Sequence, residues 1–121
     1  MPEYAAIFKP AEAFSRITSA AVTGGQLVIV SGNDTIAPSS AASSAWLGVA
    51  ANDAAFGDVV TVLTGGVHEL AASGAIAAGA RVLPAAGGAV ADIGSGTDYS
   101  QVVGIALAAA SGGKVRVKLA R

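Results

Sequence analysis

The sequence predicts a mainly β protein, and three observations support this fold class. Short runs rich in valine, isoleucine and leucine recur along most of the chain, with the length and composition of strands. Glycine pairs at positions 24–25, 65–66, 87–88 and 112–113 place turns between these runs. Residues 114–119 read Lys-Val-Arg-Val-Lys-Leu, a strict alternation that predicts a strand with one apolar and one cationic face.

The first segment differs from the rest of the chain. Pro2 and Pro10 favour extended backbone around them, and the apolar side chains between them follow no regular alternation. We therefore expect an extended N-terminal arm over residues 1–13. A single β-rich domain over residues 14–121 is expected to follow it.

Within this domain the apolar runs predict strands that alternate with the glycine turns. The expected strands cover residues 26–30, 45–50, 58–63, 67–70, 81–83, 101–107 and 114–119. Helix competes only over the Ala-rich residues 71–80, because alanine has the highest helix propensity. Gly74 and Gly79 interrupt that stretch, so we expect no helix there.

The strand pattern also repeats within the chain. Residues 25–30 match 79–84 at an offset of 54, and residues 47–50 and 57–63 match 103–106 and 113–119 at an offset of 56. Chance similarity in a Gly-, Val- and Ala-rich sequence is one explanation. The structural explanation is two pseudo-symmetric three-stranded lobes, over about residues 24–63 and 78–119, that bury apolar faces against each other. Gly48 and Gly104 would then mark a bulge or a close backbone approach in equivalent strands.

One difference between the two copies suggests an interface. At the offset of 56, Val60 and Val62 occupy the positions of Arg116 and Lys118, which face outward in the alternating strand. We therefore expect Val60 and Val62 to face outward and to form an oligomer interface. A thin core, with 29 alanines in 121 residues, also favours self-association.

Composition excludes several classes of function. Seven basic residues against eight acidic ones leave no surplus of positive charge for nucleic acid. Cysteine is absent, so a disulfide framework and cysteine-based metal sites are excluded. No apolar run reaches the length of a membrane span, and charged residues interrupt the N-terminal stretch where a signal peptide would be apolar. We therefore expect no nucleic-acid and no membrane partner.

No motif for catalysis or metal binding emerges, so we expect no catalytic, cofactor-binding or metal-binding residues and no enzyme activity. His68 is the only histidine, whereas a zinc site needs three or four ligands. A Ser-His-Asp arrangement is not excluded by residue counts, but no Gly-x-Ser-x-Gly motif supports it. His68 is interpreted as a strand histidine at a surface or interface, and Trp46 as a core or interface residue. A hydrolase with an unrecognised site stays open as a third alternative.

The order of the segments resembles a known family. A Gly-x-x-Val strand precedes Leu-Gly-Val-Ala, which is followed by Gly-Asp-Val-Val-Thr-Val-Leu-Thr-Gly-Gly-Val-His-Glu-Leu and then by Ile-Ala-Ala-Gly-Ala-Arg-Val. The chain closes with Val-Val-Gly-Ile-Ala-Leu-Ala-Ala-Ala and Lys-Val-Arg-Val-Lys-Leu. Over residues 15–121 this order resembles the small capsid cement, or head decoration, proteins of tailed bacteriophages.

The resemblance implies a compact β-clip or β-tulip-like barrel or sandwich. It implies a structural virion protein that binds the outer surface of the phage capsid and stabilises it. The implied partners are the major capsid protein and further copies of the same chain in a homotrimer, and no cofactor is implied. The implied location is the virion, with host cytoplasm as the site of assembly. The alternative function is a small β-barrel binding module for carbohydrate or peptide.

Two surfaces are candidates for the capsid contact. The resemblance assigns the contact to the N-terminal arm, whose candidate residues are Tyr4, Ile7, Phe8, Lys9 and Pro10. A second candidate is an electrostatic contact, because residues 114–121 have a net charge of +4 and residues 1–113 one of −5. Its residues are Lys114, Arg116, Lys118 and Arg121. The same cations could instead protect the exposed edge of a sheet from unwanted strand pairing.

Overall fold

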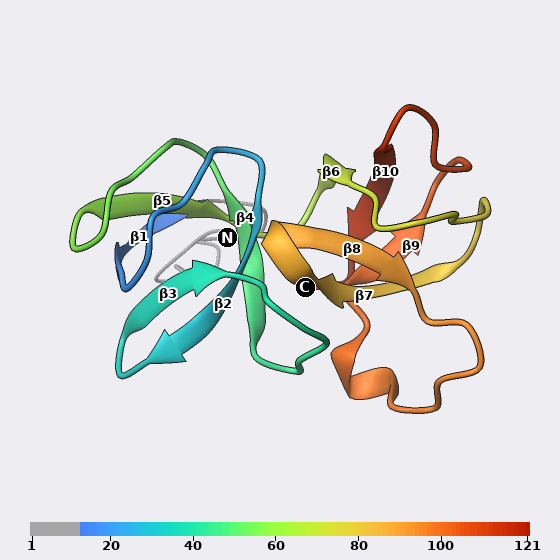
Figure 1. Ribbon diagram of the computed structural model, residues 1–121, viewed down its shortest axis with the longest axis horizontal. Helices are drawn as coiled ribbons and strands as arrows, with labels where there is room; N and C mark the ends of the chain where they lie inside the picture. Colours follow the sequence, from blue (N-terminus) through green and yellow to red (C-terminus); the bar gives the residue numbers. More distant parts are fainter. Residues whose placement is uncertain (1–12) are drawn as a thin grey trace, which may run out of the picture.

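The computed structural model describes residues 13–121, which form strands, turns and two short 3-10 helices (Figure 1). The mainly β fold class is thereby confirmed. The Ala-rich residues 71–80 contain no helix, as predicted. Among residues 13–121, no helix has the length and apolar character needed to cross a bilayer. The predicted arm lies outside the described residues, except for Ala13.

Residues 13–63 form lobe 1, a closed barrel with the strand order β1-β3-β2-β4-β5 (Figure 1, blue to green). Its strands are β1 (Ala13–Thr18), β2 (Leu27–Gly32), β3 (Thr35–Pro38), β4 (Trp46–Ala50) and β5 (Val59–Leu63). The barrel closes where β1 and β3 run parallel, with Thr18 opposite Ile36. All other strand pairs in this barrel are antiparallel.

Residues 67–121 form lobe 2, a five-stranded sheet with the order β6-β10-β9-β7-β8 (Figure 1, yellow to red). Its elements are β6 (Val67–Ala71), β7 (Arg81–Ala85), η1 (Ala86–Gly88), β8 (Ala89–Asp92), η2 (Tyr99–Gln101), β9 (Gly104–Ala106) and β10 (Lys114–Leu119). A parallel bridge between Ala72 and Val90 joins the two ends of this sheet. The two lobes lie side by side (Figure 1), and the turn between β7 and β8 lies against lobe 1, where the Gly88 amide donates to the carbonyl oxygen of Ser39.

The two lobes have the same topology. Strands β1 to β5 correspond in order to β6 to β10, and corresponding strands then have the same neighbours, once the bridge between Ala72 and Val90 is counted as the contact of β6 with β8. The closing pair Thr18↔Ile36 of lobe 1 recurs 54 residues later as Ala72↔Val90. The two lobes thus repeat one topology, but each has five strands where three were expected. Strands β1, β3 and β8 were not expected from the sequence, and β6 was expected outside the second lobe.

The glycines of the equivalent strands β4 and β9 also correspond. Gly48 lies opposite Val28, and Gly104 lies opposite Val82. A Cβ at Gly48 would overlap the carbonyl oxygen of Leu63, and one at Gly104 would overlap that of Lys118. Gly48 and Gly104 were expected to mark either a bulge or a close backbone approach. The close backbone approach is present at both sites.

Two apolar clusters stabilise the fold. The smaller cluster fills the barrel of lobe 1 and consists of Val22, Val28, Ile36, Ala50, Val60 and Val62. The larger cluster fills lobe 2, and lobe 1 contributes Leu27, Trp46 and Val49 to it. Since these three side chains lie outside the lobe 1 barrel, they join the lobes along an apolar boundary that we call the seam. The predicted burial of apolar faces between the lobes is therefore present.

Candidate interaction surfaces

The predicted oligomer interface at Val60 and Val62 is wrong in its orientation. Both side chains are fully buried inside the lobe 1 barrel, with 0% of their surface exposed. The neighbouring Val59 is 58% exposed and faces outward instead. Val60 and Val62 therefore stabilise the barrel and offer no surface to a partner.

The strand register explains this error. Ala50 pairs with Val62 in lobe 1, and the equivalent Ala106 pairs with Val117 in lobe 2. Val62 thus corresponds to buried Val117, at an offset of 55, and not to exposed Lys118. A slip of one residue in a strand alignment exchanges the two faces of the strand.

The cationic residues of β10 take the predicted positions. Lys114, Arg116 and Lys118 are exposed and alternate with buried Val115, Val117 and Leu119. We call Lys114, Arg116 and Lys118 the cationic strip. Strand β10 lies between β6 and β9, so the cationic strip does not protect a sheet edge, and that alternative is wrong.

Arg121 is separate from the cationic strip, because it is engaged at the seam. Its Nη2 donates hydrogen bonds to the carbonyl oxygens of Ser44, at 2.8 Å, and Trp46, at 3.0 Å. Its Cζ lies 4.3 Å from the centroid of the Trp46 ring. Trp46 itself is 2% exposed, which confirms its predicted core or interface position.

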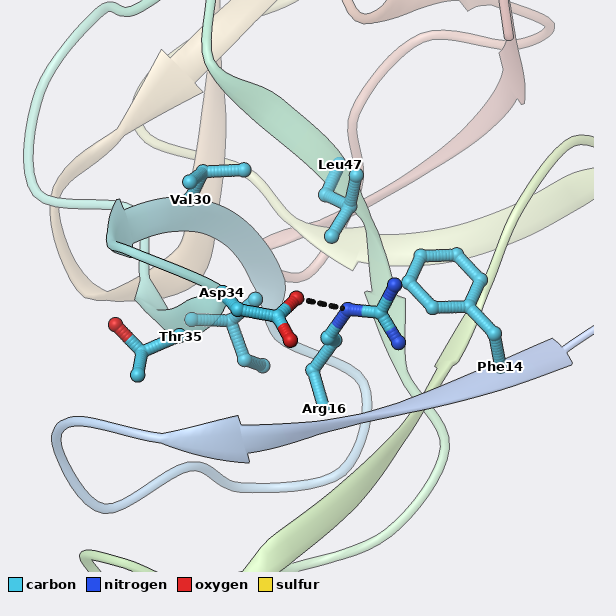
Figure 2. Close-up of a pocket in the computed structure, with 7 residues that line it drawn as sticks. Phe14, Arg16, Val30, Asp34, Thr35 and Leu47 are labelled. Carbon is cyan, nitrogen blue, oxygen red and sulfur yellow. Dashed lines mark ion pairs between the residues drawn. The ribbon is translucent and has the colours of Figure 1, made fainter.

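Lobe 1 has an open end, which we call the mouth (Figure 2). The mouth has a volume of about 350 Å³ and is lined by Phe14, Arg16, Val30, Asp34, Thr35, Ile36 and Leu47. Arg16 Nε lies 2.7 Å from Asp34 Oδ1, and Arg16 Cζ lies 5.0 Å from the centroid of the Phe14 ring. Because the two charges neutralise each other, the mouth suits a mostly apolar segment of a partner.

The equivalent end of lobe 2 is filled. The strand registers place Leu70 of β6 where lobe 1 has Arg16, and Val90 of β8 where it has Ile36. Leu70 and Val90 are fully buried in the large cluster together with the seam residues Leu27 and Val49. Lobe 1 thus covers the end of lobe 2, whereas its own end is open among residues 13–121.

A second exposed surface lies on β7 and β9 of lobe 2. It surrounds a groove of about 280 Å³ lined by Arg81, Val102, Gly104, Ile105, Leu107, Lys118, Leu119 and Ala120. Ile105 is 48% exposed and Leu107 is 49% exposed, which leaves two large apolar side chains in contact with solvent. We call this surface the outer face of lobe 2. The sequence analysis missed it, although apolar residues on both faces of residues 102–107 were a signal for it.

The remaining sequence-based expectations concern His68, metal-binding groups and the N-terminal arm. The half-buried His68 ring has Nε2 2.8 Å from the carbonyl oxygen of Gly65, so it braces the turn before β6. No group of three or more metal-ligating side chains gathers within residues 13–121. The candidate arm residues lie outside the described part of the chain: Tyr4, Ile7, Phe8, Lys9 and Pro10.

Similarity to known proteins identifies the family to which the chain belongs. No curated protein matches it. A crystal structure of the N base of head fiber gp8.5 from bacteriophage phi29 has the same fold, with a TM-score of 0.64 and 22% sequence identity. The alignment covers 89% of this chain and 92% of that chain. The profile of the phage cement proteins matches residues 10–121. The chain therefore belongs to the phage cement protein family and is a structural protein of the phage virion.

Proposed function

We propose that the protein binds the outer surface of the phage capsid as a homo-oligomer, expected to be a trimer, and stabilises the shell. Membership of the phage cement protein family is the observation that supports this function most strongly. It also favours this function over the alternative carbohydrate- or peptide-binding module. The major capsid protein is the proposed partner.

The N-terminal arm is the proposed capsid contact. Tyr4, Ile7 and Phe8 would each contribute roughly 1.5–3 kcal/mol when buried on a partner. This offsets part of the cost of ordering the arm, about 1–2 kcal/mol per residue. An arm that also adds a strand to a capsid sheet would gain main-chain hydrogen bonds.

The cationic strip is the competing contact. Lys114, Arg116 and Lys118 are exposed on one face of β10, so together they present positive charge to an acidic capsid surface. Arg121 is not part of this proposal, since its guanidinium already binds Ser44 and Trp46. A contact made by the strip depends on salt, whereas burial of apolar arm residues does not.

Co-sedimentation with capsids that lack this protein tests both contacts. Deletion of residues 2–10 should abolish co-sedimentation without lowering the melting temperature of the free protein. Reversal of the cationic strip by Lys114→Glu and Arg116→Glu serves as the matched variant and should leave binding within a few-fold. Wild-type binding should also survive about 0.5 M salt, where the Debye length falls to about 4 Å.

Two results would argue against the arm. Wild-type affinity of the truncated protein would exclude it as the main contact. Loss of binding in high salt, together with loss in the charge-reversed variant, would assign the contact to the cationic strip. If no variant and no salt condition changes binding, neither proposed contact is correct.

A further inference from the structure

The seam between the lobes joins two dissimilar surfaces. One is the outer face of lobe 1, where Leu27 of β2 and Val49 of β4 pair and point away from the barrel. The other is the end of lobe 2, where Leu70, Val90 and Val103 are fully buried in the same cluster. The outer face of lobe 1 therefore covers the end of lobe 2, as neighbouring units cover each other in a stack of structural repeats.

Hydrogen bonds fix the turn between β7 and β8 against lobe 1. Gln26 Nε2 donates to the carbonyl oxygen of Gly87 at 3.0 Å, and Ser39 Oγ donates to that of Ala85 at 2.7 Å. The Gly88 amide donates to the carbonyl oxygen of Ser39 at 3.0 Å. A Cβ at Gly88 would overlap Gln26, so glycine is required for this close approach.

Both surfaces of the seam occur a second time, and there no residue between 13 and 121 covers them. The pair Leu27↔Val49 of lobe 1 recurs in lobe 2 as Arg81↔Ile105, on its exposed outer face. The end of lobe 2 recurs in lobe 1 as the open mouth beside Asp34. Each chain thus has two surfaces without a partner among residues 13–121: the outer face of lobe 2 and the mouth of lobe 1.

We propose that the outer face of lobe 2 docks into the mouth of lobe 1 of a second copy, in a contact that repeats the seam between chains. The inference rests on the proposed self-association and is independent of capsid attachment. It also explains why two large apolar side chains, Ile105 and Leu107, are exposed on one surface. Exposed apolar patches of this kind are typical of interaction sites.

The residues at the equivalent positions are complementary. Asp34 directly precedes β3 as Gly88 directly precedes β8, and Gln26 directly precedes β2 as Ala80 directly precedes β7, each at the offset of 54. At the seam the large side chain of Gln26 meets Gly88. At the proposed contact the small side chain of Ala80 would meet the larger Asp34. Asp34 and Gly88 also share a positive φ, of 61° and 73°.

The charges on the two surfaces are complementary as well. Asp34, which is 74% exposed in its side chain, would lie beside Arg81, the neighbour of Ala80. Lys118 also lines the outer face of lobe 2. The Asp34 carboxylate, which already pairs with Arg16 of its own chain, would therefore also face a cationic rim around the apolar centre of the contact.

This contact uses different surfaces on the two copies. Such a contact forms a closed ring when a whole number of copies completes one full turn. Otherwise the copies extend into a filament. The proposed trimer would then be a ring in which lobes 1 and 2 alternate. Every mouth in such a ring is covered by an outer face.

Cysteine cross-linking tests the contact directly, because the chain contains no cysteine of its own. Asp34→Cys and Ala80→Cys are made as separate full-length variants, mixed and oxidised. An intermolecular disulfide dimer is expected in the mixture and in neither variant alone, since the contact is not self-complementary. Cross-linking of either variant to itself, or no cross-linking in the mixture, would overturn the proposed geometry.

A second measurement does not require cysteine at the strained Asp34 position. In analytical ultracentrifugation at micromolar concentration, wild type should be an oligomer. Ile105→Asp should raise the dissociation constant at least tenfold, roughly the effect of 1.4 kcal/mol. Phe56→Asp is the matched control, because Phe56 is an exposed apolar residue of lobe 1 that lines neither the mouth nor the groove of lobe 2; it should associate as wild type does.

The outcomes separate this inference from the function it rests on. A monomeric wild type, including one whose mouth is filled by its own residues 1–12 or by capsid protein, would remove both self-association and this contact. An oligomer that Ile105→Asp leaves intact would retain self-association and reject this contact. Capsid binding by a monomer would leave the capsid proposal standing alone.

Discussion

Lobe 1 and lobe 2 share their strand order and most of their interior but differ on their surfaces. Equivalent interior positions are apolar and buried in both lobes, as with Val28 and Val82 or Val62 and Val117. Equivalent outward positions have diverged: Leu27 is buried at the seam, whereas Arg81 is exposed. The fold therefore constrains only the interior of each lobe.

The difference shows how a duplicated fold acquires distinct surfaces. Because alternate residues of a strand face opposite sides, an outward position can change without disturbing the interior. Lobe 1 uses its outward positions Leu27 and Val49 to bind lobe 2, whereas the equivalent positions of lobe 2, Arg81 and Ile105, are exposed. Substitutions at the two kinds of position test this division between similar interiors and divergent exteriors.

The largest effect is expected inside the barrel of lobe 1. Val60→Lys places an unpaired charge at a site with no solvent exposure and should cost more than about 4 kcal/mol of unfolding free energy. Val59→Lys, on the exposed face of the same strand, should change stability by less than about 0.5 kcal/mol. Thermal denaturation followed by circular dichroism measures both. Equal effects would mean that the two faces of β5 are not distinct.

The next effect is expected at the seam. Trp46→Ala should cost about 3–5 kcal/mol, because it removes the largest side chain that joins the lobes. Trp46→Phe should cost much less, since the Trp46 Nε1 finds no hydrogen-bond acceptor among the described residues. Chemical denaturation of both variants provides the comparison. A negligible effect of Trp46→Ala would indicate that the lobes do not depend on the seam.

A smaller effect is expected at the equivalent glycines. Gly48→Ala and Gly104→Ala should each cost about 1–3 kcal/mol, because the added methyl group meets a backbone carbonyl that moves only with its strand. Gly24→Ala is the control, with its nearest atoms at 3.4 Å. The melting temperatures should fall by similar amounts in the two lobes. A large difference between Gly48→Ala and Gly104→Ala would break the structural equivalence of β4 and β9.

The smallest effect is expected at the mouth. Arg16→Leu gives lobe 1 the residue that Leu70 provides in lobe 2, and it removes a partly exposed ion pair with Asp34. Such pairs contribute about 0–1 kcal/mol, so the unfolding free energy should change by no more than that. A fall of several kcal/mol in a urea titration would show that the mouth depends on the Arg16 charge.

Much of the fold could be predicted from sequence because its strands are short, apolar and separated by glycine. The strands that were missed lack this pattern. Strand β3 ends in Pro38, a residue that argues against a strand interior, and β8 is short and rich in alanine. Strand β1 adjoins the proline-rich start of the chain and was partly assigned to the arm.

The candidate sites were less predictable, because they depend on register. Lys114, Arg116 and Lys118 were placed correctly, since their alternation lies within one strand. Val60 and Val62 were placed by comparison with another strand, and one residue of difference reversed their orientation. The outer face of lobe 2 is recognisable only when the seam shows what the same face does in lobe 1.

Cryo-electron microscopy of capsids incubated with the full-length protein tests the proposed function most directly. The capsids should come from particles that lack the protein, and the density should be compared with that of undecorated capsids. We expect oligomers of two-lobed subunits on the outer surface, with each lobe 2 against lobe 1 of a neighbour. Undecorated capsids at saturating protein concentration, or density confined to the inner surface, would contradict it.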